Sequence, residues 1–233
     1  MELYGGIMKK SDMYKFSIKQ WNPFQGCKYD CVYCDKSFKA QAKRQKQNCI
    51  KCYNYEPHYH PERLEDRLPI SHYMEFIFTC ASGDISFCST EFLNKIVTKM
   101  FTRPYTQFLI QSKNPITFNR VKFPRNVILG TTIETDDDEL YSKHNISKAP
   151  LPSQRYKDFL SVEHPSKMIT IEPILPFTRE LSKWVENINP IMVWIGYESK
   201  GTTFPEPSYK QFKELYSQIS ELHIPVILKT IKK

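Results

Sequence analysis

The sequence lacks any long apolar run. Nowhere in its 233 residues does a hydrophobic stretch reach the roughly 18 residues that a membrane-spanning helix needs. The first residues, Met1 to Lys19, alternate polar and apolar side chains and contain no apolar region of the kind found in secretory signal peptides. We therefore expect a cytoplasmic protein with no membrane contact.

Cysteine is infrequent and its count is odd. Seven cysteines cannot all pair, and without a secretory segment their thiols are expected to be reduced. Cys80 and Cys88 fit no ligand spacing, so we expect them in the core. The sequence also has no internal repeat and no low-complexity linker. Its length and its 40% hydrophobic content predict one folded domain over residues 1–233, of unknown oligomeric state.

Positive charge exceeds negative charge. The formal net charge of +8 favours a polyanionic partner such as DNA or RNA, through attraction to phosphates and release of their counterions. Many basic proteins simply carry solvated lysines, so composition leaves both interpretations open.

Short, nearly all-apolar runs recur along the chain. They are typical of strands buried on both faces, as in a parallel sheet. We expect strands over 15–19, 75–79, 107–111, 127–132, 168–171, 191–196 and 225–228. Apolar residues at helical spacing predict helices over 90–101, 179–188 and 208–222. This alternation predicts an α/β fold, a partial (β/α)6-type TIM barrel, whose active site would lie at the carboxyl ends of the strands.

Three cysteines follow the first predicted strand at the spacing C-x3-C-x2-C, as Cys27, Cys31 and Cys34. A cubane iron–sulfur cluster has four irons, so three thiolates leave one iron open to a substrate or cofactor. A structural zinc site normally needs four protein ligands. Zinc and unmetallated thiols remain as alternatives, although inert thiols are not expected to cluster in this way.

This triplet, with Tyr33 directly before its third cysteine, resembles the signature of the radical S-adenosylmethionine (radical SAM) superfamily. Further segments extend the resemblance over most of the chain, towards a phage-associated radical SAM family: Trp21-Asn22-Pro23, Pro57 to Leu64, Ile171-Glu172-Pro173 and Ile195 to Glu198.

The resemblance implies a partial barrel with the cluster loop after the first strand. It implies a [4Fe-4S] cluster on Cys27, Cys31 and Cys34, with S-adenosylmethionine chelating the fourth iron. One electron, from a flavodoxin- or ferredoxin-type reductant, would cleave this cofactor to a 5′-deoxyadenosyl radical that abstracts hydrogen from a substrate.

The resemblance also implies residues that bind S-adenosylmethionine. They lie in the cysteine segment, in the turn after the second strand and at the ends of the fourth and sixth strands: Tyr33, Ser82, Gly83, Asp84, Thr131, Thr132, Glu134 and Gly196. The superfamily often has a Gly-Gly-Glu-like turn where this chain has Ser82-Gly83-Asp84. Ordinary structural roles remain open: a core aromatic for Tyr33, an Asp-capped turn for Asp84 and a helix start for the acidic run that follows Glu134.

Polar residues also end other predicted strands and suggest a polar ring around the barrel mouth. They are Gln111, Ser112, Lys113, Glu172, Glu198 and Lys229. Any one of them alone has an equally good structural explanation.

A basic insertion at about 36–66 contains a second group of ligand-type residues. Cys49 and Cys52 have the C-x2-C spacing of a zinc knuckle or an additional cluster, and His58 and His60 complete four ligands. H-x-H is not the usual spacing, so loop thiols beside surface histidines remain an alternative. Basic and tyrosine side chains in this insertion suit either a phosphate backbone with stacked bases or a solvated surface.

The sequence thus favours a radical SAM enzyme whose substrate is a nucleic acid base, in modification or repair; its catalytic residues are unknown. A peptide or a small metabolite is the alternative substrate. An alternative of another class is a non-enzymatic, zinc-stabilised nucleic-acid-binding protein, in which both cysteine groups would bind zinc. Metal analysis separates the two classes.

Overall fold

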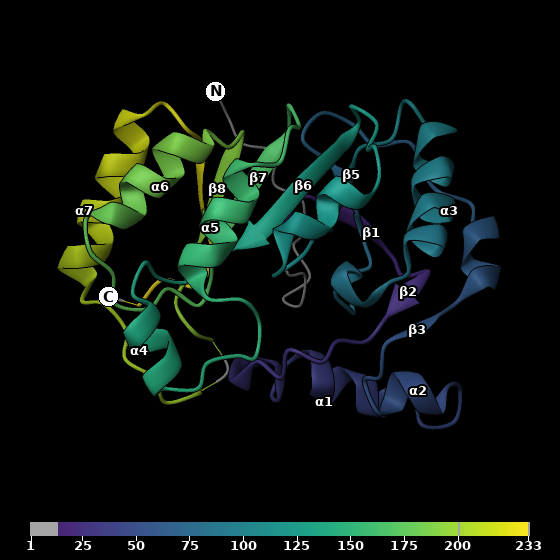
Figure 1. Ribbon diagram of the computed structural model, residues 1–233, viewed down its shortest axis with the longest axis horizontal. Helices are drawn as coiled ribbons and strands as arrows, with labels where there is room; N and C mark the ends of the chain where they lie inside the picture. Colours follow the sequence, from purple (N-terminus) through teal and green to yellow (C-terminus); the bar gives the residue numbers. More distant parts are fainter. Residues whose placement is uncertain (1–13, 200, 233) are drawn as a thin grey trace.

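The computed structural model describes residues 14–199 and 201–232. Its centre is a parallel seven-stranded sheet that is curled into a half-barrel, with strand order β1-β4-β5-β6-β7-β8-β9 (Figure 1). The strands are β1 (Ser17–Trp21), β4 (Phe76–Thr79), β5 (Phe108–Gln111), β6 (Val127–Thr132), β7 (Lys167–Ile171), β8 (Met192–Ile195) and β9 (Val226–Leu228). All seven predicted strands are therefore confirmed, and so is the parallel α/β class.

Both faces of the sheet are apolar. Successive side chains point to opposite faces, and the strands carry apolar residues at both sets of positions. Outward residues such as Ile77 and Ile110 pack against the helices, while Phe78, Leu109 and Trp194 form a second cluster on the other face. The helices that join the strands are α3 (Thr90–Phe101), α4 (Asp138–Lys143), α5 (Pro152–Leu160), α6 (Glu180–Ile188) and α7 (Tyr209–Glu221). The three predicted helices are confirmed as α3, α6 and α7, whereas α5 was not predicted. Cys80 and Cys88 are buried in the helix-side core, as expected.

The segment 36–66, here called the insertion, lies between β1 and β4 in the chain. It contains α1 (Phe38–Ala42), α2 (Ile50–Tyr53) and β3 (His58–Tyr59). β3 pairs antiparallel with β2 (Phe24–Gln25), which lies just after β1. Figure 1 shows α1, α2 and α4 on the side towards which the arrowhead of β6 points, so the insertion lies at the carboxyl end of the sheet. Short 3-10 helices complete the described elements: η1 (Val32–Cys34), η2 (Lys43–Gln45), η3 (Pro61–Glu65), η4 (Ile85–Phe87) and η5 (Pro115–Arg120).

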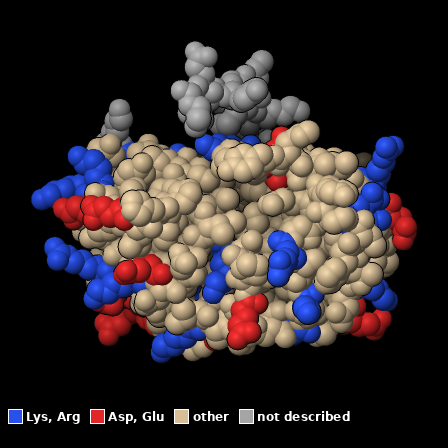
Figure 2. All heavy atoms as spheres, turned by 90° about the horizontal axis from the view of Figure 1, so that it is seen from above, with Lys and Arg blue, Asp and Glu red and all other residues tan. Residues whose placement is uncertain are grey.

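The described residues also bear on the expected partners. No helix within residues 14–199 and 201–232 has both the length and the hydropathy needed to cross a membrane. The described part of the face seen in Figure 2 carries lysine and arginine side chains intermixed with aspartate and glutamate along its edges. This face therefore does not present the continuous basic surface that a net charge of +8 could have produced.

Candidate active site and metal centre

Backbone contacts fix the start of the cysteine loop, residues 22–34, against the end of β4. Gly26 has a φ of +90°, and a Cβ added there would lie 2.0 Å from the carbonyl oxygen of Glu56. Gly83 is also tightly enclosed, because its Cβ would lie 2.8 Å from the Gly26 nitrogen. The Gly26 N–H donates to the Ser82 carbonyl at 3.0 Å, and the Asp84 N–H donates back to the Gly26 carbonyl at 3.2 Å. Only glycine fits both positions, so these backbones can touch.

The three thiols of the loop are free and lie in a small apolar cluster with Tyr29, Phe87 and Ala149. The Tyr29 N–H donates to Cys27 Sγ at 3.4 Å, and Cys31 Sγ lies 3.0 Å from Ser147 Oγ. A hydrogen bond from the Cys34 thiol lowers the pKa of Cys31 to about 6, and nearby Lys113 acts in the same direction. The loop thus favours a thiolate, the form that binds metals, at Cys31. Burial raises the pKa of Cys27, and the hydrogen bond with Cys31 together with burial raises that of Cys34.

The three thiols of the cysteine loop lie apart from the group of candidate metal ligands in the described residues. Among the described residues, one group brings at least three Cys, His, Asp or Glu ligand atoms within 4.8 Å of one another, and it does not include Cys27, Cys31 or Cys34.

Glu134 is the centre of a buried ionic network beside this loop. Its carboxylate accepts a hydrogen bond from the Tyr33 hydroxyl at 2.6 Å and forms ion pairs with Lys113 and with Arg155, the latter at 2.7 Å. Burial alone would raise the pKa of Glu134, but Arg155 and Lys113 together lower it to about 2. Glu134 therefore holds Tyr33 beside the cysteines, and its charge is already compensated within the protein.

Arg155 comes from α5 and was missed in the sequence, because an arginine in a polar stretch suggests an exposed side chain. Its side chain is fully buried and also donates to the Thr132 carbonyl. Its guanidinium lies 5.1 Å from the centre of the Tyr141 ring, and its Nε and one terminal nitrogen have no hydrogen-bond partner among the described residues. A buried arginine of this kind marks an electrostatic centre that no sequence pattern signals.

Asp84 is occupied by local structure. Its carboxylate accepts from the Ser86 N–H at 2.9 Å, the Ser112 hydroxyl at 2.7 Å and the Lys113 N–H at 2.8 Å. This is the Asp-capped turn that the sequence left open, and it joins the end of β4 to the end of β5. That Asp84 binds a cofactor amine stays a prediction, and its carboxylate already accepts three hydrogen bonds.

The strand ends carry the expected polar groups. Tyr14 donates to Gln111 at 2.8 Å and lies 2.8 Å from the Thr170 hydroxyl, while Lys229 pairs with Glu172. Two strand-end glycines provide the space, because a Cβ at Gly130 would collide with the side chain of Gln111 and one at Gly196 would crowd Glu172.

The two threonines at the end of β6 are arranged differently. Thr131 is buried and donates to the Ser112 carbonyl at 2.8 Å, whereas Thr132 is half-buried. Because successive strand residues face opposite sides of a sheet, only Thr132 shares the face of Gly130. Thr132 is thus the more accessible of the two predicted cofactor contacts.

A polar cavity of about 340 Å³ lies between the cysteine loop and the insertion. Gly26, Ser82 and Tyr55 line it. Burial raises the pKa of Tyr55, and the charges of Cys27, Cys31 and Cys34 raise it further, so Tyr55 lies near all three thiols. The cavity is therefore next to the thiols. Among the described residues, the rest of the lining is rich in amide and guanidinium groups and contains no carboxylate. The amides and guanidiniums belong to Gln20, Asn22, Gln25, Gln41, Gln45, Arg44 and Arg63. Such a lining suits an anionic or amide-bearing ligand.

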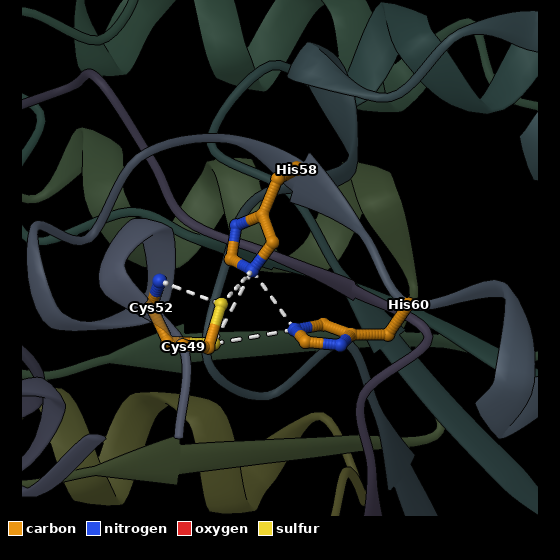
Figure 3. A group of neighbouring side chains, drawn as sticks. All are labelled: Cys49, Cys52, His58 and His60. Carbon is orange, nitrogen blue, oxygen red and sulfur yellow. Dashed lines mark hydrogen bonds between the residues drawn. The ribbon is translucent and has the colours of Figure 1, made fainter. Parts of the chain in front are cut away.

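Cys49, Cys52, His58 and His60, here called the Cys/His group, converge within the insertion (Figure 3). Cys52 Sγ lies 3.2 Å from the Nε2 atoms of both histidines, and the two Nε2 atoms lie 2.8 Å apart. Cys49 Sγ lies 3.4 Å from His58 Nε2 and accepts from the Cys52 N–H at 3.4 Å. The sequence predicted these four residues as a possible site, and the structure brings all four together.

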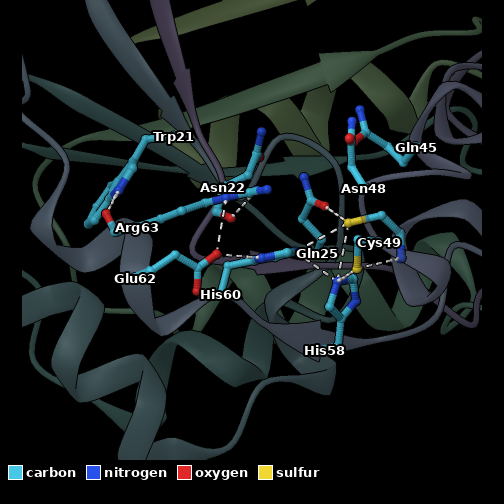
Figure 4. Close-up of polar contacts among 11 residues, drawn as sticks. Trp21, Asn22, Gln25, Gln45, Asn48, Cys49, His58, His60, Glu62 and Arg63 are labelled. Carbon is cyan, nitrogen blue, oxygen red and sulfur yellow. Dashed lines mark hydrogen bonds and ion pairs between the residues drawn. The ribbon is translucent and has the colours of Figure 1, made fainter.

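Surrounding groups fix both imidazole rings, and Figure 4 shows Glu62 beside His60 and Gln25 beside the cysteines. His58 Nδ1 donates to the Glu56 carbonyl at 2.7 Å, and His60 Nδ1 donates to the Glu62 carboxylate at 2.8 Å. Gln25, at the end of β2, accepts from the Cys52 thiol at 2.6 Å. Sequence reasoning missed Gln25 and Glu62, although a carboxylate two residues after a candidate histidine is a recognisable signal of an outer partner.

No model of a known protein family matches the chain, and no curated protein matches it.

Proposed function

We propose that this chain is a radical SAM enzyme with a (β/α)6-type partial barrel and the cluster loop after β1. The observation that carries the proposal is the triplet Cys27, Cys31 and Cys34, free and clustered in the loop that follows the first strand of a curled parallel sheet. In barrels of parallel strands, active sites lie at this carboxyl end.

The residues around the triplet fit a [4Fe-4S] cluster. The thiols lie in an apolar setting, a backbone N–H points to Cys27 Sγ, and the hydrogen bond from Cys34 together with the charge of Lys113 lowers the pKa of Cys31. Apolar surroundings, N–H donors to sulfur and nearby cations are the means by which proteins stabilise and tune such clusters.

When bound, the cluster and S-adenosylmethionine would supply a 5′-deoxyadenosyl radical that abstracts hydrogen from the substrate. The chain's own residues would shield and orient. Tyr29, Phe87 and Ala149 exclude water from the thiols, and Glu134 fixes Tyr33 beside them. Ser82, Gly83, Thr131, Thr132 and Gly196 remain predicted cofactor contacts.

A nucleic acid base is the substrate class that the cavity favours. Amide side chains read the edges of bases, and arginines attract phosphates. The cavity joins five amides and two arginines without any carboxylate, next to the cysteine loop. A peptide or small metabolite is the competing class, and the lining favours it only if that substrate is anionic.

Anaerobic reconstitution with iron and sulfide tests the cluster itself. The wild type is expected to bind four irons and four sulfides per chain on the triplet. Cys31→Ser should prevent this, while Cys88→Ala, which removes a buried thiol outside the site, should not. If the folded wild type binds zinc at the triplet, or if Cys31→Ser retains the full cluster, the proposal is wrong and the zinc-stabilised nucleic-acid-binding protein becomes the better account.

A further inference from the structure

We infer that the Cys/His group binds one structural zinc ion, and that this ion fixes the insertion over the cysteine loop. The inference does not rest on the proposed enzymatic function, because its ligands are separate from Cys27, Cys31 and Cys34.

The distances suit a single tetrahedral ion. With Zn–S bonds of about 2.3 Å and Zn–N bonds of about 2.0–2.1 Å, a tetrahedron places S and N about 3.5 Å apart and the two N atoms about 3.3 Å apart. Three S···N separations of 3.2–3.4 Å and the N···N separation of 2.8 Å lie within about half an ångström of these values. Small shifts of the side chains therefore complete the site.

Both histidines offer a lone pair to the centre of the group. Because the Glu56 carbonyl and the Glu62 carboxylate can only accept, the Nδ1 atoms of His58 and His60 carry the protons. The two Nε2 atoms then face each other as acceptors at 2.8 Å. Two lone pairs at this distance repel unless a cation lies between them. Carbonyl and carboxylate partners on Nδ1 are also the usual outer shell of zinc-bound histidine.

The donor set distinguishes zinc from iron–sulfur alternatives. In a Rieske-type [2Fe-2S] cluster, the two histidines bind one iron and the two cysteines bind the other, which separates sulfur from nitrogen. Here all four ligand atoms lie within 4.8 Å of one another. Two thiolates and two imidazoles around one point indicate zinc, and four protein ligands leave no open position for catalysis.

The α-helices of the insertion bury little apolar surface, whereas Tyr59 and Leu64 after them pack against Phe24, Phe92 and the core. α1 and η3 contribute no buried residue, and α2 contributes Cys52 alone. A segment that buries so little apolar surface depends on a metal or another cross-link for a fixed structure. The same segment contacts the cysteine loop, because β3 pairs with β2, Gln25 touches Cys52 and the Cys27 N–H donates to the Tyr55 carbonyl at 3.2 Å. The zinc site thus contacts β2, whose last residue, Gln25, lies two positions before Cys27 in the chain.

Zinc analysis of the full chain, purified without added metal and then given Zn²⁺, tests the inference. We expect one zinc per chain, with two sulfur and two nitrogen ligands by X-ray absorption spectroscopy. A Cys49→Ser/Cys52→Ser variant and a His60→Ala variant should lose this zinc. His144→Ala, which removes an exposed histidine elsewhere, should keep it.

Two further measurements keep the outcomes distinct. A Cys27→Ser/Cys31→Ser/Cys34→Ser variant should retain zinc, so zinc in this variant supports the inference whether or not the chain is an enzyme. In the zinc-free variants, limited proteolysis should cut within 36–66 while the sheet stays intact. Absence of zinc from folded wild type, a first shell other than two sulfurs and two nitrogens, or zinc retained after both cysteines are replaced would overturn the inference.

Discussion

At the scale of single residues, Glu134 joins three parts of the chain. It binds Tyr33 in the cysteine loop, Lys113 after β5 and Arg155 in α5. The sequence marked Glu134 as a polar strand end, but nothing in the pattern revealed that two cations compensate it. Such pairings join residues far apart in the chain, and composition and periodicity describe only neighbours.

Glu134→Gln should therefore destabilise the fold by about 3–5 kcal/mol at neutral pH, because it leaves a buried cation uncompensated. The folded pKa of Glu134 is lowered to about 2. Its contribution is therefore complete above the unfolded value of about 4.3 and is lost as the pH falls towards about 2. Urea unfolding should show the gap between wild type and Glu134→Gln closing over that range, with exposed Glu139→Gln as the control. A gap that does not change with pH would contradict this explanation.

Gly26→Ala tests the contact that anchors the cysteine loop. The added Cβ would meet the Glu56 carbonyl, whereas at Gly201, which also has a positive φ, the nearest atom is the flexible end of Lys36 at 4.0 Å. Gly201→Ala should cost about 1 kcal/mol from backbone strain alone. Gly26→Ala should cost clearly more and should lower the iron content after reconstitution. Equal thermal stability and equal iron content in the two variants would exclude a special role for Gly26.

At the scale of elements, burial decides what the sequence reveals. The strands were predictable because both of their faces are buried, and α3, α6 and α7 because one apolar face repeats regularly. α5 was not, since its buried side consists of Pro152, Arg155 and Phe159, only one of which is a large apolar residue. The Cys/His group was visible as spacing, but its outer partners depend on how β2 and β3 pair.

Phe159→Ala tests whether α5 belongs to the core in spite of its polar sequence. Phe159 is fully buried and contacts Phe118, while the next residue, Leu160, is 43% exposed. The buried change should reduce the free energy of unfolding by about 3–5 kcal/mol, and Leu160→Ala should reduce it far less. Chemical denaturation measures both. Similar losses would mean that α5 packs differently.

At the scale of the whole molecule, we expect positive charge to contribute to nucleic acid binding where it lines the polar cavity. Arg44 is exposed and lines the polar cavity. Lys210 on α7 is also exposed but does not line it. Arg44→Ala should weaken binding of a short single-stranded oligonucleotide and reduce the salt dependence by roughly one phosphate contact. Lys210→Ala should leave both unchanged. Fluorescence anisotropy at several salt concentrations measures this, and equal effects of the two variants would count against a nucleic acid in the cavity.

The cysteine triplet carries the proposal that this chain is a radical SAM enzyme. Reconstituted protein, reduced anaerobically with dithionite in the presence of S-adenosylmethionine, should release 5′-deoxyadenosine, detected by mass spectrometry. Wild type and Cys88→Ala should both release it, and Cys31→Ser should release none. No release from folded wild type that carries its full iron and sulfide, or equal release from Cys31→Ser, would contradict the assignment of this chain as a radical SAM enzyme.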